Sequence, residues 1–236
     1  MRTIKWGLVG IALTTFAGQA GASLVLIGAI PSTGNGIGAV NTSLTFQNTG
    51  SESGCVGFNG ATGACPTGFT GGNEKPGSSQ TNVFTAAQLG FTATNNFSNL
   101  VVLFNGNEGG NVSDQTITLD SLGLTLYSAS GTALQTFTTT GPNTFAAFPG
   151  VGNAGFGFRL DAAQAAQANA LLASNPLLQI GTEANASNAQ GGAETIQLTT
   201  LTAPGQLSAV PEPGTVTMLS LGFVLIGVSA RRRQRE

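Results

Sequence analysis

The side chains that could carry acid–base or nucleophilic chemistry are few: two cysteines, ten acidic residues and no histidine in 236 residues. Without histidine, this chain cannot build Ser-His-Asp or Cys-His nucleophilic sites, and it lacks the common zinc-ligand sets. A carboxylate pair such as Asp114 and Asp120 would suffice for glycoside hydrolysis, but nothing in the sequence supports that pairing. We therefore predict a protein that is not an enzyme and that uses no cofactor or metal.

One segment, residues 105–114 (NGNEGGNVSD), gathers oxygen ligands of the kind that a hard cation such as Ca²⁺ accepts. Its spacing matches no calcium-binding loop, and Asn and Gly are also the ordinary residues of hairpin turns, so we interpret it as a turn. We assign no function to the four N-x-S/T sequons, which a chain rich in Asn and Thr produces by composition alone: Asn41, Asn96, Asn111 and Asn185.

The C-terminal residues 210–236 consist of three parts: Pro211-Glu212-Pro213, an apolar run over 215–230 and a basic end over 231–235. As a transmembrane helix, the apolar run would be about 24 Å long against roughly 30 Å of bilayer hydrocarbon, and snorkelling arginines can extend it. Clustered arginines favour the cytoplasmic face, so the chain before the prolines is expected outside. The arginines that set this orientation are Arg231, Arg232, Arg233 and Arg235.

This order of parts resembles the PEP-CTERM sorting signal of envelope proteins from Gram-negative bacteria that make exopolysaccharide. The resemblance covers about a tenth of the chain. It implies that an exosortase, an integral membrane protease, recognises Pro211-Glu212-Pro213, where the prolines keep the backbone extended and accessible. It also implies that the inner membrane holds the chain only transiently. The alternative is a permanently anchored single-pass protein with an ordinary proline-containing linker.

The N-terminal residues 1–22 have the pattern of a signal peptide. Arg2 and Lys5 precede an apolar run over 6–17, and Ala20, Gly21 and Ala22 are small residues before Ser23. We predict a signal helix that the Sec machinery exports and that signal peptidase cleaves after Ala22. An uncleaved N-terminal anchor is the competing interpretation. Export agrees with the orientation that the C-terminal arginines imply.

Residues 23–210 contain two basic and eight acidic residues, and two minus eight gives a net charge of −6. No basic patch is left that could neutralise several phosphates, so nucleic-acid binding is not expected. Cys55 and Cys65 bracket a Gly-rich segment, and two cysteines in an exported chain are more often paired than free. We predict a disulfide between them, which would stabilise by about 2 to 3 kcal/mol.

The passenger domain, residues 23–209, is predicted to be mostly β. Apolar and polar residues alternate over 116–119 and 122–127, which places one face of each strand on a core. Short, evenly punctuated runs of this kind favour an antiparallel β-sandwich, with a hairpin turn at 128–131. The predicted strands are Ser23–Ile30, Ser43–Asn48, Asn99–Phe104, Gln115–Leu119, Leu122–Ser128, Ala133–Thr139, Gly155–Leu160 and Thr195–Thr202.

One segment, Asp161–Ala173, predicts a short α-helix, because Asp161 can cap it and Gln164 follows three residues later. We expect a buried helix face formed by Ala162, Ala165, Ala166, Asn169, Leu172 and Ala173. Two Gly-rich stretches, 50–79 and 184–193, are predicted to be loops.

Together these patterns indicate an exported, non-enzymatic protein of the cell envelope, cell surface or extracellular matrix, associated with exopolysaccharide or biofilm. Its expected partners are the Sec machinery, signal peptidase, the exosortase and the exopolysaccharide. The alternative is an extracellular carbohydrate-binding module whose aromatic rings stack on sugars. The sequence gives that alternative little support, because few aromatic rings are suited to stacking on sugars. Tyr127 is the only tyrosine, no tryptophan follows the signal peptide, and the phenylalanines suit a core.

Overall fold

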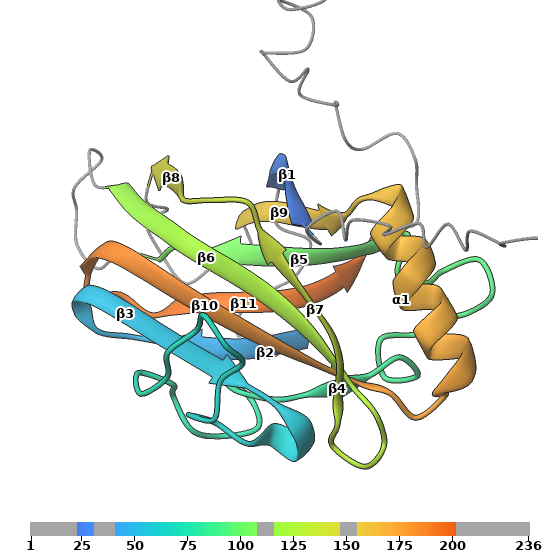
Figure 1. Ribbon diagram of the computed structural model, residues 1–236. Helices are drawn as coiled ribbons and strands as arrows, with labels where there is room; N and C mark the ends of the chain where they lie inside the picture. The colour runs from blue at the N-terminus through green and yellow to red at the C-terminus, as the bar shows by residue number, and fades with distance from the viewer. Residues whose placement is uncertain (1–22, 31–40, 108–115, 147–154, 202–236) are drawn as a thin grey trace, which may run out of the picture.

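A computed structural model describes residues 23–30, 41–107, 116–146 and 155–201, which form a curved sheet flanked by one α-helix (Figure 1). The predicted signal peptide and sorting tail lie outside these residues, as do Asn111, Asp114 and most of the 105–114 segment. No helix within the described ranges is both long and apolar enough to cross a membrane.

The strands are β1 (Ser23–Ile30), β2 (Asn41–Phe46), β3 (Thr49–Val56), β4 (Phe84–Thr85), β5 (Leu100–Asn105), β6 (Thr116–Tyr127), β7 (Ala133–Thr139), β8 (Asn143–Ala146), β9 (Gly155–Leu160), β10 (Gln179–Gln190) and β11 (Glu194–Thr200). The helix α1 spans Ala162–Ser174, and a single 3-10 turn, η1, spans Phe58–Gly60. The prediction of a mostly β domain with one short helix is confirmed.

The sheet itself differs from the predicted sandwich of two antiparallel layers. All the strands belong to one mixed sheet in the order β2-β11-β5-β9-β1-β7-β6-β10-β3, with β4 added to β10 and β8 to β6. One pair, β1 with β7, is parallel. The two end strands, β2 and β3, are joined by only Gln47 and Asn48, and Ser43 on β2 accepts a 2.9 Å hydrogen bond from Thr182 on β10. The sheet is therefore nearly closed on itself.

The interior of this sheet is filled by large apolar side chains, as the alternating strands require. Its five largest fully buried side chains are Phe46, Phe97, Phe104, Phe137 and Phe158. The interpretation of the phenylalanines as core residues is confirmed for these five. The same core also contains small side chains, such as Ala184 and Ala186 on β10.

Two predicted loops contain strands. β3 takes up residues 50–56 of the predicted loop 50–79, and β10 takes up residues 184–190 of the predicted loop 184–193. Both strands consist mainly of Gly, Ala, Ser, Asn and Glu, so neither shows the β-branched or aromatic enrichment that marks a strand in sequence. Pairing on both sides of β10, with β3 and with β6, supplies the stability that its own residues lack.

The helix α1 begins as predicted. The Asp161 side chain accepts a 2.8 Å hydrogen bond from the Gln164 backbone N–H, and the Gln164 side chain accepts one from the Asp161 N–H, which completes a capping box. The predicted buried face is partly wrong. Gln164, Ala165 and Ala168 are buried, whereas Ala162, Ala166 and Ala173 are exposed, because α1 meets β7 and β9 along a different side of the helix.

Candidate functional site

The outer face of β10 carries a fully buried carboxyl group, that of Glu183. In the strand registers Glu183 lies between Cys55 on β3 and Gly123 on β6. The glycine leaves the space that the carboxyl occupies, since a Cβ on Gly123 would lie 2.6 Å from Glu183 Cγ. Any larger residue at position 123 would displace the glutamate.

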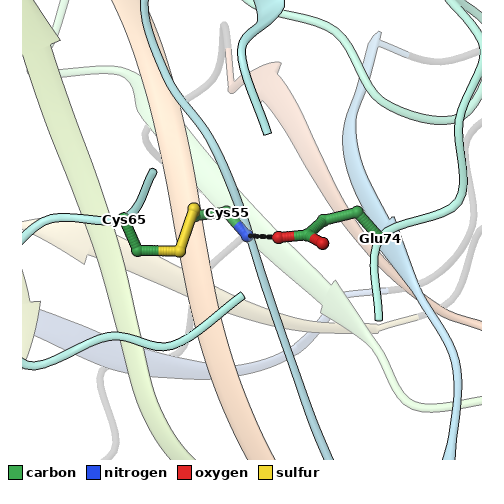
Figure 2. A group of neighbouring side chains, drawn as sticks. All are labelled: Cys55, Cys65 and Glu74. Carbon is green, nitrogen blue, oxygen red and sulfur yellow. Dashed lines mark hydrogen bonds between the residues drawn. A yellow bond between two sulfur atoms is a disulfide. The ribbon is translucent and has the colours of Figure 1, made fainter. Parts of the chain in front are cut away.

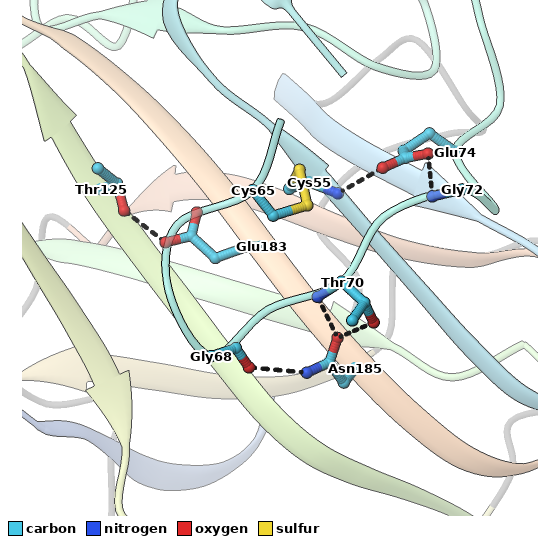
Figure 3. The surroundings of a disulfide bond; sticks show 9 residues. All are labelled: Cys55, Cys65, Gly68, Thr70, Gly72, Glu74, Thr125, Glu183 and Asn185. Carbon is cyan, nitrogen blue, oxygen red and sulfur yellow. Dashed lines mark hydrogen bonds between the residues drawn. A yellow bond between two sulfur atoms is a disulfide. The ribbon is translucent and has the colours of Figure 1, made fainter. Parts of the chain in front are cut away.

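A hydroxyl group of the neighbouring strand β6, that of Thr125, reaches the carboxyl of Glu183 (Figure 3). Thr125 on β6 donates a 2.5 Å hydrogen bond from Oγ1 to Glu183 Oε1, and Thr136 Oγ1 on β7 lies 2.9 Å from Thr125 Oγ1. The second oxygen, Oε2, is buried and has no hydrogen-bond partner among the residues that the structure describes. A charged carboxylate in this place would lack most of the hydrogen bonds that it has in water.

The carboxyl is therefore held in its neutral form. Burial raises the pKa of Glu183 from 4.5 to about 8, although the hydrogen bond from Thr125 opposes the shift. The pKa of Tyr127 on β6 is raised as well, by burial and by the negative charge that Glu183 would carry. Both shifts favour the neutral forms of these two side chains.

A segment that we call the cover segment, residues 57–72, lies over this layer and is held by a disulfide (Figure 3). The predicted bond between Cys55 and Cys65 is present, with the two Cα atoms 5.5 Å apart. Phe69 in the cover segment packs so closely on β6 that a Cβ on Gly123 would lie 2.8 Å from its Cζ. The cover segment excludes water from Glu183 although most of its own residues are exposed.

Two polar side chains anchor the cover segment further. Asn185 on β10 donates to the Gly68 carbonyl and accepts from the Thr70 N–H, both at 3.3 Å. Glu74 accepts from the backbone N–H groups of Cys55, at 2.9 Å, and of Gly72, at 2.7 Å (Figures 2 and 3). The sequon at Asn185 thus has a structural explanation, because its amide is bonded to the cover segment.

Cys55, Cys65 and Glu74 are the one group of three in the described ranges whose side chains could together hold a metal ion (Figure 2). Both sulfur atoms are used in the disulfide, and both oxygens of Glu74 accept backbone hydrogen bonds. The arrangement therefore acts as an anchor for a loop in the oxidised protein.

The residues singled out for chemistry in the sequence do not meet at this site. Asp114 lies outside the described residues, and Asp120 accepts a 3.0 Å hydrogen bond from Ser187 on an exposed part of the sheet. Sequence reasoning missed Glu183 altogether. Its one sequence signal is a lone glutamate between Thr182 and Ala184, which resembles the exposed face of a polar strand.

The predicted sorting and cleavage residues, Pro211, Glu212, Pro213, Ala20 and Ala22, are outside the described residues. In a comparison with protein-family models, residues 209–233, a range that contains the first three, match the PEP-CTERM protein-sorting motif. No curated protein and no solved structure matches the chain.

Proposed function

Because residues 209–233 carry a PEP-CTERM protein-sorting motif, the mark of exported proteins that an exosortase sorts, we propose that this chain is a structural component of the envelope or extracellular matrix. In this proposal Pro211-Glu212-Pro213 is a substrate site for the exosortase, and the arginines over 231–235 hold the tail in the inner membrane until it is cut. The passenger domain then reaches the cell surface or the matrix.

The chemistry of the passenger domain supports a structural role. Its carboxyl-bearing layer is sealed by the cover segment, and Glu183 has no exposed surface on which a substrate could bind. The disulfide between Cys55 and Cys65 suits an oxidising compartment outside the cytoplasm. These observations favour a stable, exported domain without catalytic activity.

Association with exopolysaccharide or biofilm is the finer part of the proposal. The passenger domain has few charges and many neutral hydroxyl and amide groups, which suits a matrix of hydrated polymers. Tyr127 is buried, so the single tyrosine offers no ring for stacking on sugars. We therefore place a structural component ahead of a carbohydrate-binding module.

The C-terminus of the protein from its native host tests the sorting step. Mass spectrometry should show that wild-type chains end near Val210, whereas a variant with Pro211→Ala and Pro213→Ala keeps Glu236. A Pro204→Ala variant is the matched control, because it alters a nearby proline outside the matched motif, and it should be cut normally. Wild-type chains that retain Glu236 would contradict the proposal and indicate a permanently anchored protein.

The matrix assignment needs a separate measurement. In a host that makes exopolysaccharide, the cut protein should co-purify with the polysaccharide fraction. In a strain that makes none, it should move to the soluble medium. The same distribution in both strains would remove the polysaccharide from the proposal, and shortening of the polymer by the purified protein would favour a hydrolase instead.

A further inference from the structure

The chain enters and leaves the folded domain at the same end of the sheet. β1 begins at Ser23, and its next residue, Leu24, pairs with Leu160 at the end of β9. β5 runs antiparallel to β9, so β5 begins near the place where β9 ends. There, Leu100 of β5 pairs with Thr200, the last residue of β11. The first residue of β1 and the last residue of β11 therefore lie at the same end of the sheet, with two strands between them.

Only β9 and β5 separate β1 from β11 in the sheet, so three strand spacings, about 15 Å, lie between them. Figure 1 shows the arrowheads of β9 and β11 on the side of the molecule where α1 lies. We call this end the exit face and define it by Ser23, residues 92–99 and Leu201.

The point at which the chain leaves is fixed by hydrogen bonds. Leu201 donates its N–H to the Asn99 carbonyl at 3.0 Å, and its own carbonyl accepts from the Asn99 side chain at 3.1 Å. Asn169 of α1 donates to Asn96 at 3.1 Å, and Arg159 of β9 donates to the Ser98 carbonyl. Residues 92–99 thus connect the end of β11 to the helix and to the sheet.

β11 cannot easily lengthen the tail by detaching from the sheet. It is paired along both edges, with β2 on one side and β5 on the other. Its residues Ile196 and Leu198 are buried in the core. Detaching β11 would break two ladders and expose this core, so an enzyme that acts on the folded protein must reach the tail beyond Leu201.

The two sorting signals differ in their distance from the exit face. Nine residues, 202–210, lie between Leu201 and Pro211, and a chain of this length spans at most about 35 Å. No residue lies between the predicted signal peptide and β1. The signal peptide is predicted to end at Ala22, and β1 begins at Ser23. The C-terminal site can therefore be presented by a folded domain, and the N-terminal site cannot.

We propose that the exit face is turned toward the membrane during maturation and that the exosortase cuts the tail of an already folded domain. Signal peptidase acts earlier, before β1 takes its place between β9 and β7. This inference rests on the proposed function. It adds the surface that meets the membrane protease, the order of the two cleavages and the role of residues 202–210 as a spacer.

The composition of the exit face suits close approach to a membrane or a membrane protein. The exposed side chains of residues 92–99 are small or hydrogen-bonding and carry no charge, namely Thr92, Ala93, Thr94 and Ser98. The two charged side chains beside them, the half-buried Arg159 and the exposed Asp161, are of opposite sign. Such a surface meets neither repulsion from anionic headgroups nor a strong pull toward them. The domain is therefore held near the bilayer by its tail alone and is released when the tail is cut.

Spacer length in the full chain, expressed in the native host, tests the inference. Deleting residues 203–208 leaves the matched motif intact and reduces the reach from Leu201 to Pro211 to about 14 Å. The matched control replaces the same six residues by six Gly and Ser residues. The measured quantity is the amount of the C-terminal fragment ending in Glu236 in the membrane fraction. This fragment can be measured even if the passenger domain is degraded. We expect a cleaved fraction at least tenfold lower for the deletion and unchanged for the replacement.

A further variant separates clearance of the folded domain from recognition of the spacer. Leu124 is fully buried, so Leu124→Asp should unfold the passenger. Combined with the deletion, it should restore cleavage, because an unfolded chain no longer limits the reach. Normal cleavage of the deletion alone, or no rescue by Leu124→Asp, would overturn the inference. Absence of cleavage in the wild type would instead contradict the proposed function.

Discussion

At Glu183 and Ala184 the outer and inner sides of β10 are both buried, but they are held in different ways. On the inner side, Ala184 and Ala186 pack into a core that is filled by phenylalanine and leucine rings and chains. On the outer side, Glu183 and Asn185 lie beneath a thin segment that a disulfide and a few hydrogen bonds keep in place. The inner layer is stabilised by buried apolar surface, and the outer layer is stabilised by a disulfide and hydrogen bonds.

Because of this difference, the two layers should respond differently to a change of pH or to a reducing agent. Apolar burial depends little on pH or on reducing agents, because no proton or electron is exchanged. The outer layer contains a buried acid and a disulfide, so both pH and reduction should loosen it. Substitutions on the two sides of the sheet can therefore be used to measure how independent the layers are.

The largest effect is expected at Glu183. Its raised pKa means that the folded state keeps a proton that the unfolded state releases, so stability is full below pH 4.5 and is lost as the pH rises to about 8. At about 1.4 kcal/mol per pKa unit, the loss is at most about 5 kcal/mol. Glu183→Gln keeps the shape without the charge and should abolish this loss. Urea unfolding at pH 4.5, 6 and 8 measures it, and parallel pH profiles for both proteins would contradict it.

The inner layer should respond to the loss of a ring instead. Phe104 is fully buried and packs against Phe145, with ring centroids 5.9 Å apart. Phe104→Ala should cost about 3 to 5 kcal/mol, with the same cost at every pH. Its control is Leu177→Ala, which shortens an exposed side chain and should change stability little. A strongly pH-dependent cost for Phe104→Ala would show that the two layers are coupled.

Removal of the disulfide should affect the outer layer first. Replacing Cys55 and Cys65 by Ser should lower stability by about 2 to 3 kcal/mol. Limited proteolysis should then cut within the cover segment, residues 57–72, at protease concentrations that leave the oxidised protein intact. Reduction of the wild type should reproduce the pattern. Cleavage in the sheet before cleavage in the cover segment would contradict a separately held outer layer.

The same contrast explains what the sequence could predict. Strands rich in apolar, β-branched or aromatic residues are predicted with their correct bounds, as for β1, β7 and β9, because these residue types mark a strand in the sequence itself. β6 was divided into two strands, since Asp120 and Ser121 look like a turn but form an irregularity in the ladder with β10. The hairpin turn predicted at 128–131 connects the antiparallel strands β6 and β7, and its Gly131 has φ +88°.

The outer layer could not be predicted in the same way. β3 and β10 are recognised as strands only from their pairing with neighbouring strands. Glu183 is buried because the cover segment, more than a hundred residues away in the sequence, folds over it. Of its restraints, only the disulfide had a local signal, namely two cysteines in an exported chain. Burial of a polar residue by a distant loop leaves no periodicity in the strand that carries it.

The smallest effect is expected at Asn185, which bonds to Gly68 and Thr70 in the cover segment. Asn185→Ala should cost about 1 kcal/mol, because its hydrogen bonds to the cover segment are 3.3 Å long and lie near the surface, and it also loses a 3.0 Å bond to Ser121 Oγ. The cost should appear as faster amide hydrogen exchange in residues 68–70, with exchange in the core strands unchanged. Ser187→Ala, two residues along the same strand, removes a comparable bond to Asp120 outside the cover segment and should leave residues 68–70 protected. Equal exchange of residues 68–70 in the two variants would mean that the disulfide between Cys55 and Cys65 alone holds the cover segment in place. The hydrogen bonds of Asn185 would then add nothing to its stability.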